Sequence, residues 1–428
     1  MVLMPVNKAL EKILSHISAL PAEEIPITHG YNRVLAEDVR AIDNIPPFRN
    51  SAMDGYAVHA ADVAAATPES PVVLPVSGYI AAGDVPANPL PAGNAIRIMT
   101  GAPVPDGANA VVRFEKTSDF IDYPNLPAGH VTIFHPVATS DNVREPGEDV
   151  AAGTVVLQKG HALRPQDVGM LAAVGKGRVR VHKIPRVGIL ATGDELVGVD
   201  EPLAPGKIRN SNEYTLAALV ESYGAVAVPL GVARDSTTDL VKKIDAGLAQ
   251  GIDMLLSSAG VSAGDYDVVK NVLAQNGEMH FWQVDIKPGK PLAYGTVRGV
   301  PLIGLPGNPV ASVVAFEVFA RAAILKLGGH VELEKPILTA TLVEDVHNSG
   351  RQHYMRAHLF QSKNKYRVTT RGSGVLVQGS GILSSLVNAN ALVVVPSGVK
   401  FIPAGTAVDV WMLDWRGGQI PTNSQEKN

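Results

Sequence analysis

The chain contains no cysteine in its 428 residues. Disulfides, thiolate nucleophiles and zinc–thiolate sites are therefore excluded, and the composition fits a reducing compartment. A large excess of one charge sign is also missing, because the formal net charge is −4. Without a basic block, the chain is not expected to bind nucleic acid or an anionic membrane over a broad face.

Long apolar runs are missing as well. No stretch approaches the roughly 18 apolar residues of a membrane span. Lys8 and Glu11 interrupt the apolar pattern near the N-terminus, which is unlike a signal peptide. We therefore expect a cytoplasmic protein. Its 46% hydrophobic and 18% charged residues are typical of a soluble protein with a buried core, and its length predicts two to four domains.

The apolar pattern changes several times along the chain. Apolar side chains three and four apart in residues 6–20 predict an amphipathic helix that ends before Pro21. Short apolar runs between Pro and Gly turns predict small β domains elsewhere. The predicted division is a discontinuous linker domain (1–45 and 145–182), an inserted β domain (46–144), an α/β domain (183–330), a C-terminal β barrel (331–416) and a flexible tail (417–428).

Residues 186–330 alternate apolar strands such as "RVGILAT" with helical patterns such as "NEYTLAALVESYG". This alternation predicts a multidomain α/β protein in which this domain is doubly wound around a largely parallel sheet. Ligands of such sheets bind beyond the carboxyl ends of the strands. The loops that follow the strands are therefore the first candidates for a functional site.

Two of these loops carry carboxylates. In "ATGDEL", Asp194 and Glu195 follow a strand and a Gly turn, where carboxylates can hold Mg²⁺ together with phosphate oxygens. A solvated turn is the alternative. In "SSAGVSAGDYD", small residues let a ligand approach the backbone N–H groups. Helix capping explains Asp265, whereas Asp267 is freer to face the cleft.

Two neighbouring motifs supply positive charge. "LPGNPVAS" opens a helix at Asn308 and Pro309 whose positive end could bind an oxyanion, although capping preferences explain much of this motif. "KPGKP" places Lys287 and Lys290 on either side of a rigid turn. A surface pair of this kind is usually only solvated, but between anion-binding loops it can neutralise a phosphate or a metal oxyanion.

Further candidates lie outside this domain. Thr100 follows a predicted strand in "RIMTGAPVPDGANAVV", and Asp54 lies in "PPFRNSAMDGYAV", where an Asp-Gly turn is usually only a turn. Arg351 and Arg356 in "SGRQHYMRAHL" each present a planar fork that bonds two oxygens together. Either arginine could equally be a surface ion-pair partner.

Together these motifs closely resemble the molybdopterin molybdenumtransferase family, the bacterial MoeA-type enzymes related to the C-terminal domain of gephyrin. Five of them occur in the family's order and cover nearly the whole chain: "PPFRNSAMDGYAV", "RIMTGAPVPDGANAVV", "GILATGDELV", "KPGKP" and "GLPGNPV". The resemblance implies a cytoplasmic homodimer of four-domain subunits. The implied reaction takes adenylylated molybdopterin and molybdate, transfers molybdenum to the dithiolene sulfurs and releases AMP with a divalent cation such as Mg²⁺.

The resemblance also implies roles for single residues. The expected catalytic residues are Asp54, Thr100, Glu195 and Asp267. The expected substrate and molybdate contacts are Asp235, Gly260, Ser262, Gly264, Lys287, Lys290, Pro306, Pro309, Ser312 and Arg351 or Arg356. The candidate Mg²⁺ ligands are Glu195, Asp267 and Asp54, and Asp54 could instead be a base that orients the attacking group. The β domain that carries Asp54 is implied to reach this cleft from the other subunit.

The chain departs from the family pattern at three positions. Ala259 stands where the family has glycine, Ala311 precedes Ser312 where a serine is expected directly after Val310, and Gln283 replaces a frequent lysine. These departures leave open the choice between molybdate and tungstate, and a catalytically drifted paralogue. A gephyrin-type scaffold and a molybdopterin adenylyltransferase are two further candidate functions. A molybdopterin adenylyltransferase and apo-molybdoenzymes are the candidate protein partners.

Overall fold

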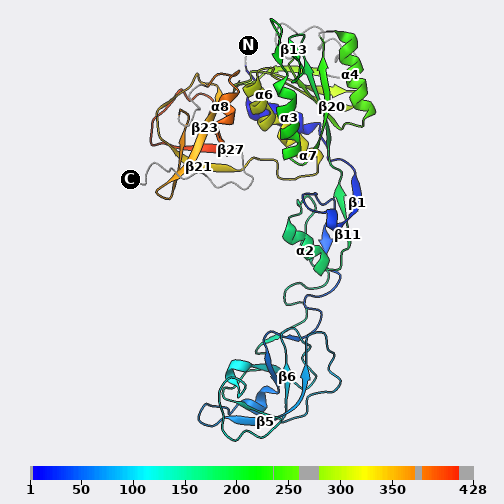
Figure 1. Ribbon diagram of the computed structural model, residues 1–428, viewed down its shortest axis with the longest axis vertical. Helices are drawn as coiled ribbons and strands as arrows, with labels where there is room; N and C mark the ends of the chain where they lie inside the picture. The colour runs from blue at the N-terminus through cyan, green and yellow to red at the C-terminus, as the bar shows by residue number, and fades with distance from the viewer. Residues whose placement is uncertain (1–2, 235, 260–278, 372–377, 414–428) are drawn as a thin grey trace.

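The computed structural model describes residues 3–234, 236–259, 279–371 and 378–413 (Figure 1). The molecule is elongated. An α/β unit and a β barrel lie side by side at one end, a small unit with α2 lies in the middle, and a β unit with β5 and β6 lies at the other end. The multidomain α/β class predicted from the sequence is confirmed. Among the described residues, no helix has both the length and the apolar character that a membrane span requires.

The central sheet has the order β15-β12-β16-β20-β19-β17. Its first four strands are parallel, and β19 pairs antiparallel with both of its neighbours, β20 and β17. The strands are β12 (Arg186–Thr192), β15 (Val226–Ala233), β16 (Met254–Ser258), β17 (Met279–Gln283), β19 (Pro291–Val297) and β20 (Val300–Leu305). After β12, the chain first adds β15 on one side of β12 and then β16 and β20 on the other side. The strand order therefore reverses beside β12. Doubly wound sheets bind their ligands at such a reversal.

Helices cover both faces of this sheet. They are α3 (Ser211–Ser222), α4 (Thr237–Ala249), α6 (Pro309–Ala315), a π-helical segment (Phe316–Ala320) and α7 (Arg321–Leu327). Helix α4 packs in a core with β15, while α3, α6 and α7 share the largest core on the opposite face. The side chain of Asn210 caps α3 by accepting a hydrogen bond from the Glu213 backbone N–H at 3.3 Å.

The N-terminal helix α1 spans Val6–Ser15 and is shorter than the sequence predicted. The Ser15 hydroxyl and the His16 ring each bond to the Lys12 carbonyl oxygen at 2.8 Å, which occupies the acceptor that a longer helix would need. The apolar face of α1 is buried in the same core as β12 and α7. By packing, α1 therefore lies with the α/β unit, although the sequence grouped residues 1–45 with the linker domain.

A buried charge network holds the helical run from α6 to α7. The Glu317 carboxylate is 1% exposed, pairs with the Lys335 ammonium and accepts a hydrogen bond from the Tyr223 hydroxyl at 2.8 Å. A buried carboxylate needs such partners because desolvation penalises its charge. The network fixes the helix that begins at Pro309, immediately after the "LPGN" loop.

The C-terminal unit is a closed five-stranded barrel, as predicted. Its strands close in the order β23-β24-β21-β27-β25-β23. They are β21 (Ile337–Leu342), β23 (Gln352–Ser362), β24 (Lys365–Thr369), β25 (Ala391–Val395) and β27 (Ala407–Met412), with β22 (Val346–His347), β26 (Phe401–Ile402) and the short α8 (Ser384–Val387) beside them. Strand β18 (Ile286–Lys287) pairs with β23, so the "KPGKP" segment joins the barrel to the α/β unit.

The short strands β13 (Leu196–Val197) and β14 (Ile208–Arg209) pair in the α/β unit, and the other strands lie in the middle and at the far end of the molecule (Figure 1). In the middle, β1 (Ala22–Pro26) pairs with β11 (Arg178–His182), β2 (Val39–Arg40) pairs with β10 (Val155–Leu157), and α2 spans Pro165–Ala173. The far sheet has the order β7-β4-β6-β5-β8, with β4 (Gly55–Val58), β5 (Val72–Ile80), β6 (Ala95–Ile98), β7 (Ala110–Arg113) and β8 (His130–Ile133); β3 (Asn50–Ser51) pairs with β9 (Val143–Arg144). The domain limits stated from the sequence stay a prediction.

Candidate functional site

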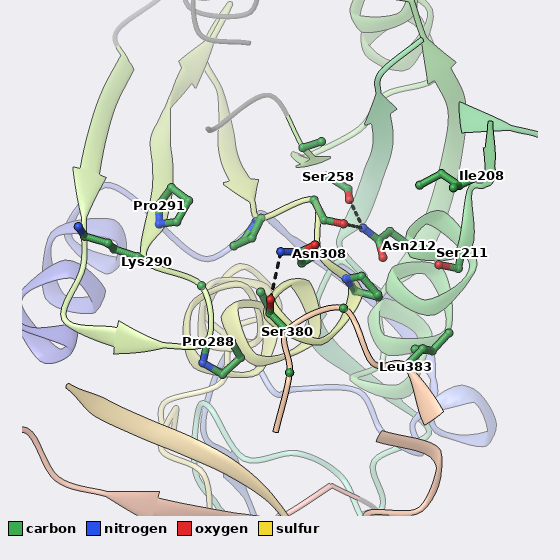
Figure 2. A pocket seen from close by; sticks show the side chains of 18 of the residues that line it. Ile208, Ser211, Asn212, Ser258, Pro288, Lys290, Pro291, Asn308, Ser380 and Leu383 are labelled. Atoms are coloured by element: carbon green, nitrogen blue, oxygen red, sulfur yellow. Dashed lines mark hydrogen bonds between the residues drawn. The ribbon is translucent and has the colours of Figure 1, made fainter. Parts of the chain in front are cut away.

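A cavity of about 1150 Å³ opens at the carboxyl ends of β12, β16 and β20 and is bounded on its other side by the barrel. Its lining includes Glu195, Asn212, Ser258, Ala259, Lys287, Lys290, Pro306, Asn308, Pro309, Arg351 and Ser380. Figure 2 places Lys290 and Pro288 on one side and Asn212, Ser211 and Ile208 on the other. The cavity therefore lies where the strand order reverses, as expected for a doubly wound sheet.

The "KPGKP" turn packs directly on the loop after β20. Gly289 has a φ of +97°, and a Cβ there would lie 3.3 Å from the Pro306 ring, so a larger residue would be both strained and crowded. Lys287 lies in β18 beside His353 of β23. The turn thus brings both lysines to the cavity while the sheet pairing holds Lys287 in place.

The cationic end of the cavity contains an arginine from the barrel unit. Arg351 Nη1 donates a hydrogen bond to the Ile286 carbonyl oxygen at 3.0 Å, which ties it to the strand of Lys287. Burial lowers the pKa of Lys287, and the positive charges of Arg351 and Arg356 lower it further. Burial and the same three cations lower the pKa of His353 to about 3, so its ring is neutral at neutral pH.

Two of the expected contacts are not part of the cavity lining. Arg356 is 0% exposed, and its guanidinium donates to the Ser385 hydroxyl at 3.1 Å and to the Gly379 carbonyl oxygen at 3.0 Å. Ser312 is buried in α6, and its hydroxyl has no hydrogen-bond partner among the described residues. Of the two arginines, only Arg351 therefore faces the cavity, while Arg356 holds the loop that contains Gly379.

Ala259 marks a strained point in the cavity wall. Its φ of +76° lies in the left-handed region, which disfavours a residue with a Cβ. A Cβ at Gly307 would lie 3.1 Å from the Ala259 methyl group. The alanine therefore narrows the gap between the loops after β16 and β20, at a position where the family pattern predicts a glycine.

Four polar residues of the cavity were absent from the predicted site. Asn212 Nδ2 donates to the Ser258 hydroxyl at 2.6 Å, and Asn308 Nδ2 donates to the Ser380 hydroxyl at 3.2 Å (Figure 2). The first bond joins α3 to β16, and the second joins the "LPGN" loop to the barrel. In the sequence, helix capping accounts for Asn308. Asn212 follows Asn210, which is the better capping residue. The pattern at both positions therefore indicates only that a helix begins there.

Glu195 is the exposed carboxylate at the cavity edge. Gly193 lies beneath it, because a Cβ at that position would clash with the Glu195 carboxylate. Among the described residues, no three His, Asp or Glu side chains gather closely enough to hold a metal. Magnesium is commonly held by one or two carboxylates plus substrate oxygens and water, so Glu195 fits as one ligand rather than as a complete site.

Asp54 and Thr100 lie together, but in the far β unit. The Thr100 backbone N–H and hydroxyl both donate to Asp54 Oδ1 at 2.7 Å. These two bonds, the backbone one first, lower the pKa of Asp54. The carboxylate is thus oriented through one of its oxygens. Neither residue lines the cavity, and β6 lies at the opposite end of the molecule (Figure 1).

Five of the expected residues have no described position. Asp235, Gly260, Ser262, Gly264 and Asp267 lie outside the described residues, as does Asp265, for which helix capping was the expectation. The described residues thus bring together Glu195, Lys287, Lys290, Pro306, Pro309 and Arg351 in one cavity, and separate them from Asp54 and Thr100.

Comparison with known proteins identifies the family. Models for the MoeA N-terminal region (domain I and II), a probable molybdopterin binding domain and the MoeA C-terminal region (domain IV) match residues 4–175, 188–326 and 339–413. The chain is 37% identical over 403 residues to molybdopterin molybdenumtransferase 2 of Mycobacterium tuberculosis, covering 91% of this chain and 94% of the relative. The chain belongs to the MoeA family.

Other MoeA proteins agree in sequence and in structure. The molybdopterin molybdenumtransferase of Haemophilus influenzae is 34% identical over 95% of this chain and 98% of its own length. A crystal structure of the molybdopterin biosynthesis MoeA protein from Pyrococcus horikoshii is 31% identical, covers 96% of this chain and 100% of its own, and has a TM-score of 0.80. The MoeA fold therefore extends over nearly the whole chain.

Proposed function

We propose that this protein is a molybdopterin molybdenumtransferase of molybdenum cofactor biosynthesis. In this reaction adenylylated molybdopterin and molybdate bind in the cavity, molybdenum is transferred to the dithiolene sulfurs, and AMP is released. The observation that carries the proposal is a cavity at the reversal of a doubly wound sheet that has Lys287, Lys290 and Arg351 in its lining. Molybdate and the phosphoanhydride are both anionic, and both need cations at short range.

The cationic end suits an oxyanion for a physical reason. Burial disfavours the protonated form of Lys287, and the charges of Arg351 and Arg356 disfavour it further. A bound dianion would reverse this effect, because an opposite charge favours the ammonium form. Binding of an oxyanion is therefore expected to raise the lowered pKa of Lys287 and to stabilise its ammonium form.

The carboxylates complete the proposal. Bound Mg²⁺ would neutralise charge that develops on the phosphate oxygens during release of AMP. Glu195, and Asp267 from outside the described residues, would hold it from the α/β unit. Asp54 has a lowered pKa and an oriented carboxylate, which makes it a poor proton acceptor and a stable anion. Of its two predicted roles, a metal ligand therefore fits better than a base.

The separation of Asp54 from the cavity favours a two-chain site. We propose a cytoplasmic homodimer in which the β unit of one chain reaches the cavity of the other, so that Asp54 and Thr100 meet Glu195 and Lys287 across the interface. A scaffold has no need for the cations that converge on the cavity, and a free-standing adenylyltransferase has no need for the β unit or the barrel. Neither of these two functions is favoured by a feature of the described residues.

The test is a transfer assay. Purified protein is incubated with adenylylated molybdopterin, Mg²⁺ and molybdate, and AMP release is measured together with reconstitution of a molybdenum-free apoenzyme. We expect both signals, both dependent on Mg²⁺. A parallel series with tungstate measures the preference for the metal. If AMP stays bound and no apoenzyme is activated, the proposed function is wrong.

A further inference from the structure

The Asn212 side chain connects three elements of the α/β unit by hydrogen bonds. It lies in the first turn of α3, and its Nδ2 donates to the Ser258 hydroxyl at the end of β16 at 2.6 Å and to the Gly307 carbonyl oxygen after β20 at 2.7 Å. Asn212, Ser258 and Gly307 all line the cavity. One side chain thus connects a helix start with the carboxyl ends of two neighbouring strands.

The bond to Gly307 determines which way the amide faces. A carbonyl oxygen can only accept, so the Asn212 atom beside it must be the nitrogen and not the oxygen. The two hydrogens of that nitrogen are then both used, one for Gly307 and one for Ser258. Figure 2 shows the Asn212 nitrogen turned toward Ser258 and its oxygen turned away from that contact.

Two hydrogen-bonding groups are left for a ligand. Asn212 Oδ1 is an acceptor with no hydrogen-bond partner among the described residues, and the Ser258 hydroxyl, which accepts from Asn212, keeps its own hydrogen to donate. A deprotonated phosphate or molybdate oxygen has no hydrogen to donate to Asn212 Oδ1 and would be repelled by it. This pair is therefore unsuited to an oxyanion.

The opposite end of the cavity carries positive charge and suits anions. Lys290 lies across the cavity from Asn212, with Asn308 and Ser380 between them (Figure 2). The cations suit the anionic groups of a substrate, while an adjacent acceptor and donor suit the edge of a nitrogen heterocycle, where an amine or ring N–H lies beside a ring nitrogen or carbonyl oxygen. The cavity is thus divided by chemistry along its length.

We propose that Asn212 and Ser258 recognise the edge of a heterocycle in the substrate. Asn212 Oδ1 accepts from the exocyclic amine of that edge, and the Ser258 hydroxyl donates to the neighbouring acceptor. This inference rests on the proposed function for the origin of the ring, because adenylylated molybdopterin contains both an adenine and a pterin with this edge. The recognition itself requires only the geometry of the pair.

The test uses matched ligands that differ at the amine. One pair is AMP and purine riboside 5′-monophosphate, which lacks the amine; the other is pterin and lumazine, in which an oxo group replaces it. Kd values are measured by calorimetry for the wild type and for Asn212→Ala, Ser258→Ala and Asn7→Ala. Asn7 lies in α1, is exposed and does not line the cavity, which makes its variant the matched control.

We expect the wild type to prefer the amine-bearing member of one pair by about tenfold, the effect of one hydrogen bond, and Asn212→Ala to abolish that preference. The pair that responds identifies the ring. Ser258→Ala should weaken both members of the same pair, and Asn7→Ala should leave the preference intact. Molybdate affinity, measured separately, should stay unchanged in all variants. A variant that loosened the loops in general would lower molybdate affinity as well.

Two results overturn the inference. One is the absence of any amine preference in the wild type, and the other is a preference that survives in Asn212→Ala. These outcomes are distinct from failure of the proposed function. A wild type that releases AMP and loads molybdenum without amine preference refutes only the heterocycle contact, whereas a wild type with amine preference but no transfer refutes only the transferase proposal.

Discussion

The cavity beside the α/β sheet and the region around Asp54 in the far β sheet differ in charge. In the cavity, Lys287 is partly buried beside Arg351 and its pKa is lowered. At the far sheet, Asp54 is partly exposed, is held by Thr100 through one oxygen, and also has a lowered pKa. The lowered pKa disfavours the charged form of Lys287 and favours the charged form of Asp54.

This difference indicates that the cavity and the region around Asp54 contribute separately to binding and to turnover. The two regions belong to different hydrophobic cores, so a change in one is not transmitted to the other by packing. Binding of an oxyanion should depend on the cavity alone. Turnover should depend on both regions, because each supplies a charge that the other lacks. The following variants separate these two dependences.

The largest effect is expected from Asp54→Asn. Asparagine keeps the shape and the acceptor for Thr100 but removes the negative charge, so turnover should fall by about 10³-fold, the scale of losing a charged group at a reacting centre. Molybdate affinity of the cavity should not change. The assay is AMP release together with calorimetry of molybdate.

Asp84→Asn is the control for that variant. Asp84 is an exposed carboxylate of the same β unit, and it accepts from the Ala81 N–H at 2.8 Å. Its replacement should leave both turnover and molybdate affinity unchanged. A loss of molybdate affinity in Asp54→Asn would contradict the division between the two regions.

Lys287→Met should have the second largest effect. Methionine fills a similar volume without charge, and removing one preorganised cation should reduce turnover by about 10²-fold and weaken molybdate binding as well. The exposed Lys365→Met serves as the control for loss of one positive charge. Normal molybdate binding by Lys287→Met would show that the cation at this end is not an oxyanion contact.

A smaller effect is expected from Ala259→Gly. Glycine tolerates the φ of +76°, so the unfolding free energy should rise by up to about 1 kcal/mol, the cost of a left-handed residue with a Cβ less the added chain entropy. The wider gap beside Gly307 should also lower KM for the adenylylated substrate by a few-fold. Chemical denaturation and steady-state kinetics measure the two changes.

Ala311→Gly is the matched comparison for that variant. Ala311 lies in the regular helix α6, where glycine should destabilise by about 1 kcal/mol. The two Ala→Gly changes should therefore have opposite signs. Destabilisation in both would mean that the backbone at Ala259 is not strained.

The smallest effect is expected from Thr100→Val. This change removes the hydroxyl bond to Asp54 but keeps the stronger backbone bond, so the pKa of Asp54 should rise only part of the way toward its ordinary value of 3.8. Because the folded pKa is lowered, ionised Asp54 stabilises the folded protein above the ordinary pKa, and this contribution is lost as the pH falls through the folded value. Carbon NMR of the Asp54 carboxyl should show its midpoint at a higher pH than in the wild type. An unchanged or lower midpoint would mean that the hydroxyl does not act on the carboxylate.

Local pattern was sufficient for the α/β unit. The run "RVGILAT" is apolar on both faces, as a buried parallel strand requires, and it forms β12, which pairs with β15 on one side and β16 on the other. Because carboxyl ends of parallel strands meet at one edge, the sequence alone predicts that the loops at Glu195 and Pro306 share one site, and both line the cavity.

Local pattern was insufficient where partners come from distant segments. Asn212 follows the capping residue Asn210, so the local sequence indicates only that a helix begins there. The hydrogen bonds of Asn212 do not show in the local pattern, because its partners Ser258 and Gly307 lie 46 and 95 residues further along the chain. The two arginines of the barrel unit were equally ambiguous. Only the closure of the barrel directs Arg351 to the cavity and buries Arg356 against Ser385.

The position of Asp54 relative to the cavity was the hardest point for sequence reasoning. Its link to Thr100 follows from strand pairing between β4 and β6. Its proposed link to Lys287 depends on a second chain, and no periodicity or turn motif within one chain encodes that contact. The expectation came from the family resemblance. It also has a physical reason, because the two regions lie at opposite ends of the single chain's structure and cannot meet within it (Figure 1).

The central claim is that one site requires two chains, and a mixed dimer tests it most directly. Asp54→Asn and Lys287→Met chains with different affinity tags are co-expressed, and the heterodimer is isolated by tandem purification. One of its two sites would combine an intact cavity with an intact Asp54, so we expect about half the wild-type rate of AMP release per dimer, although each homodimer is nearly inactive. A heterodimer as inactive as both homodimers would contradict the account.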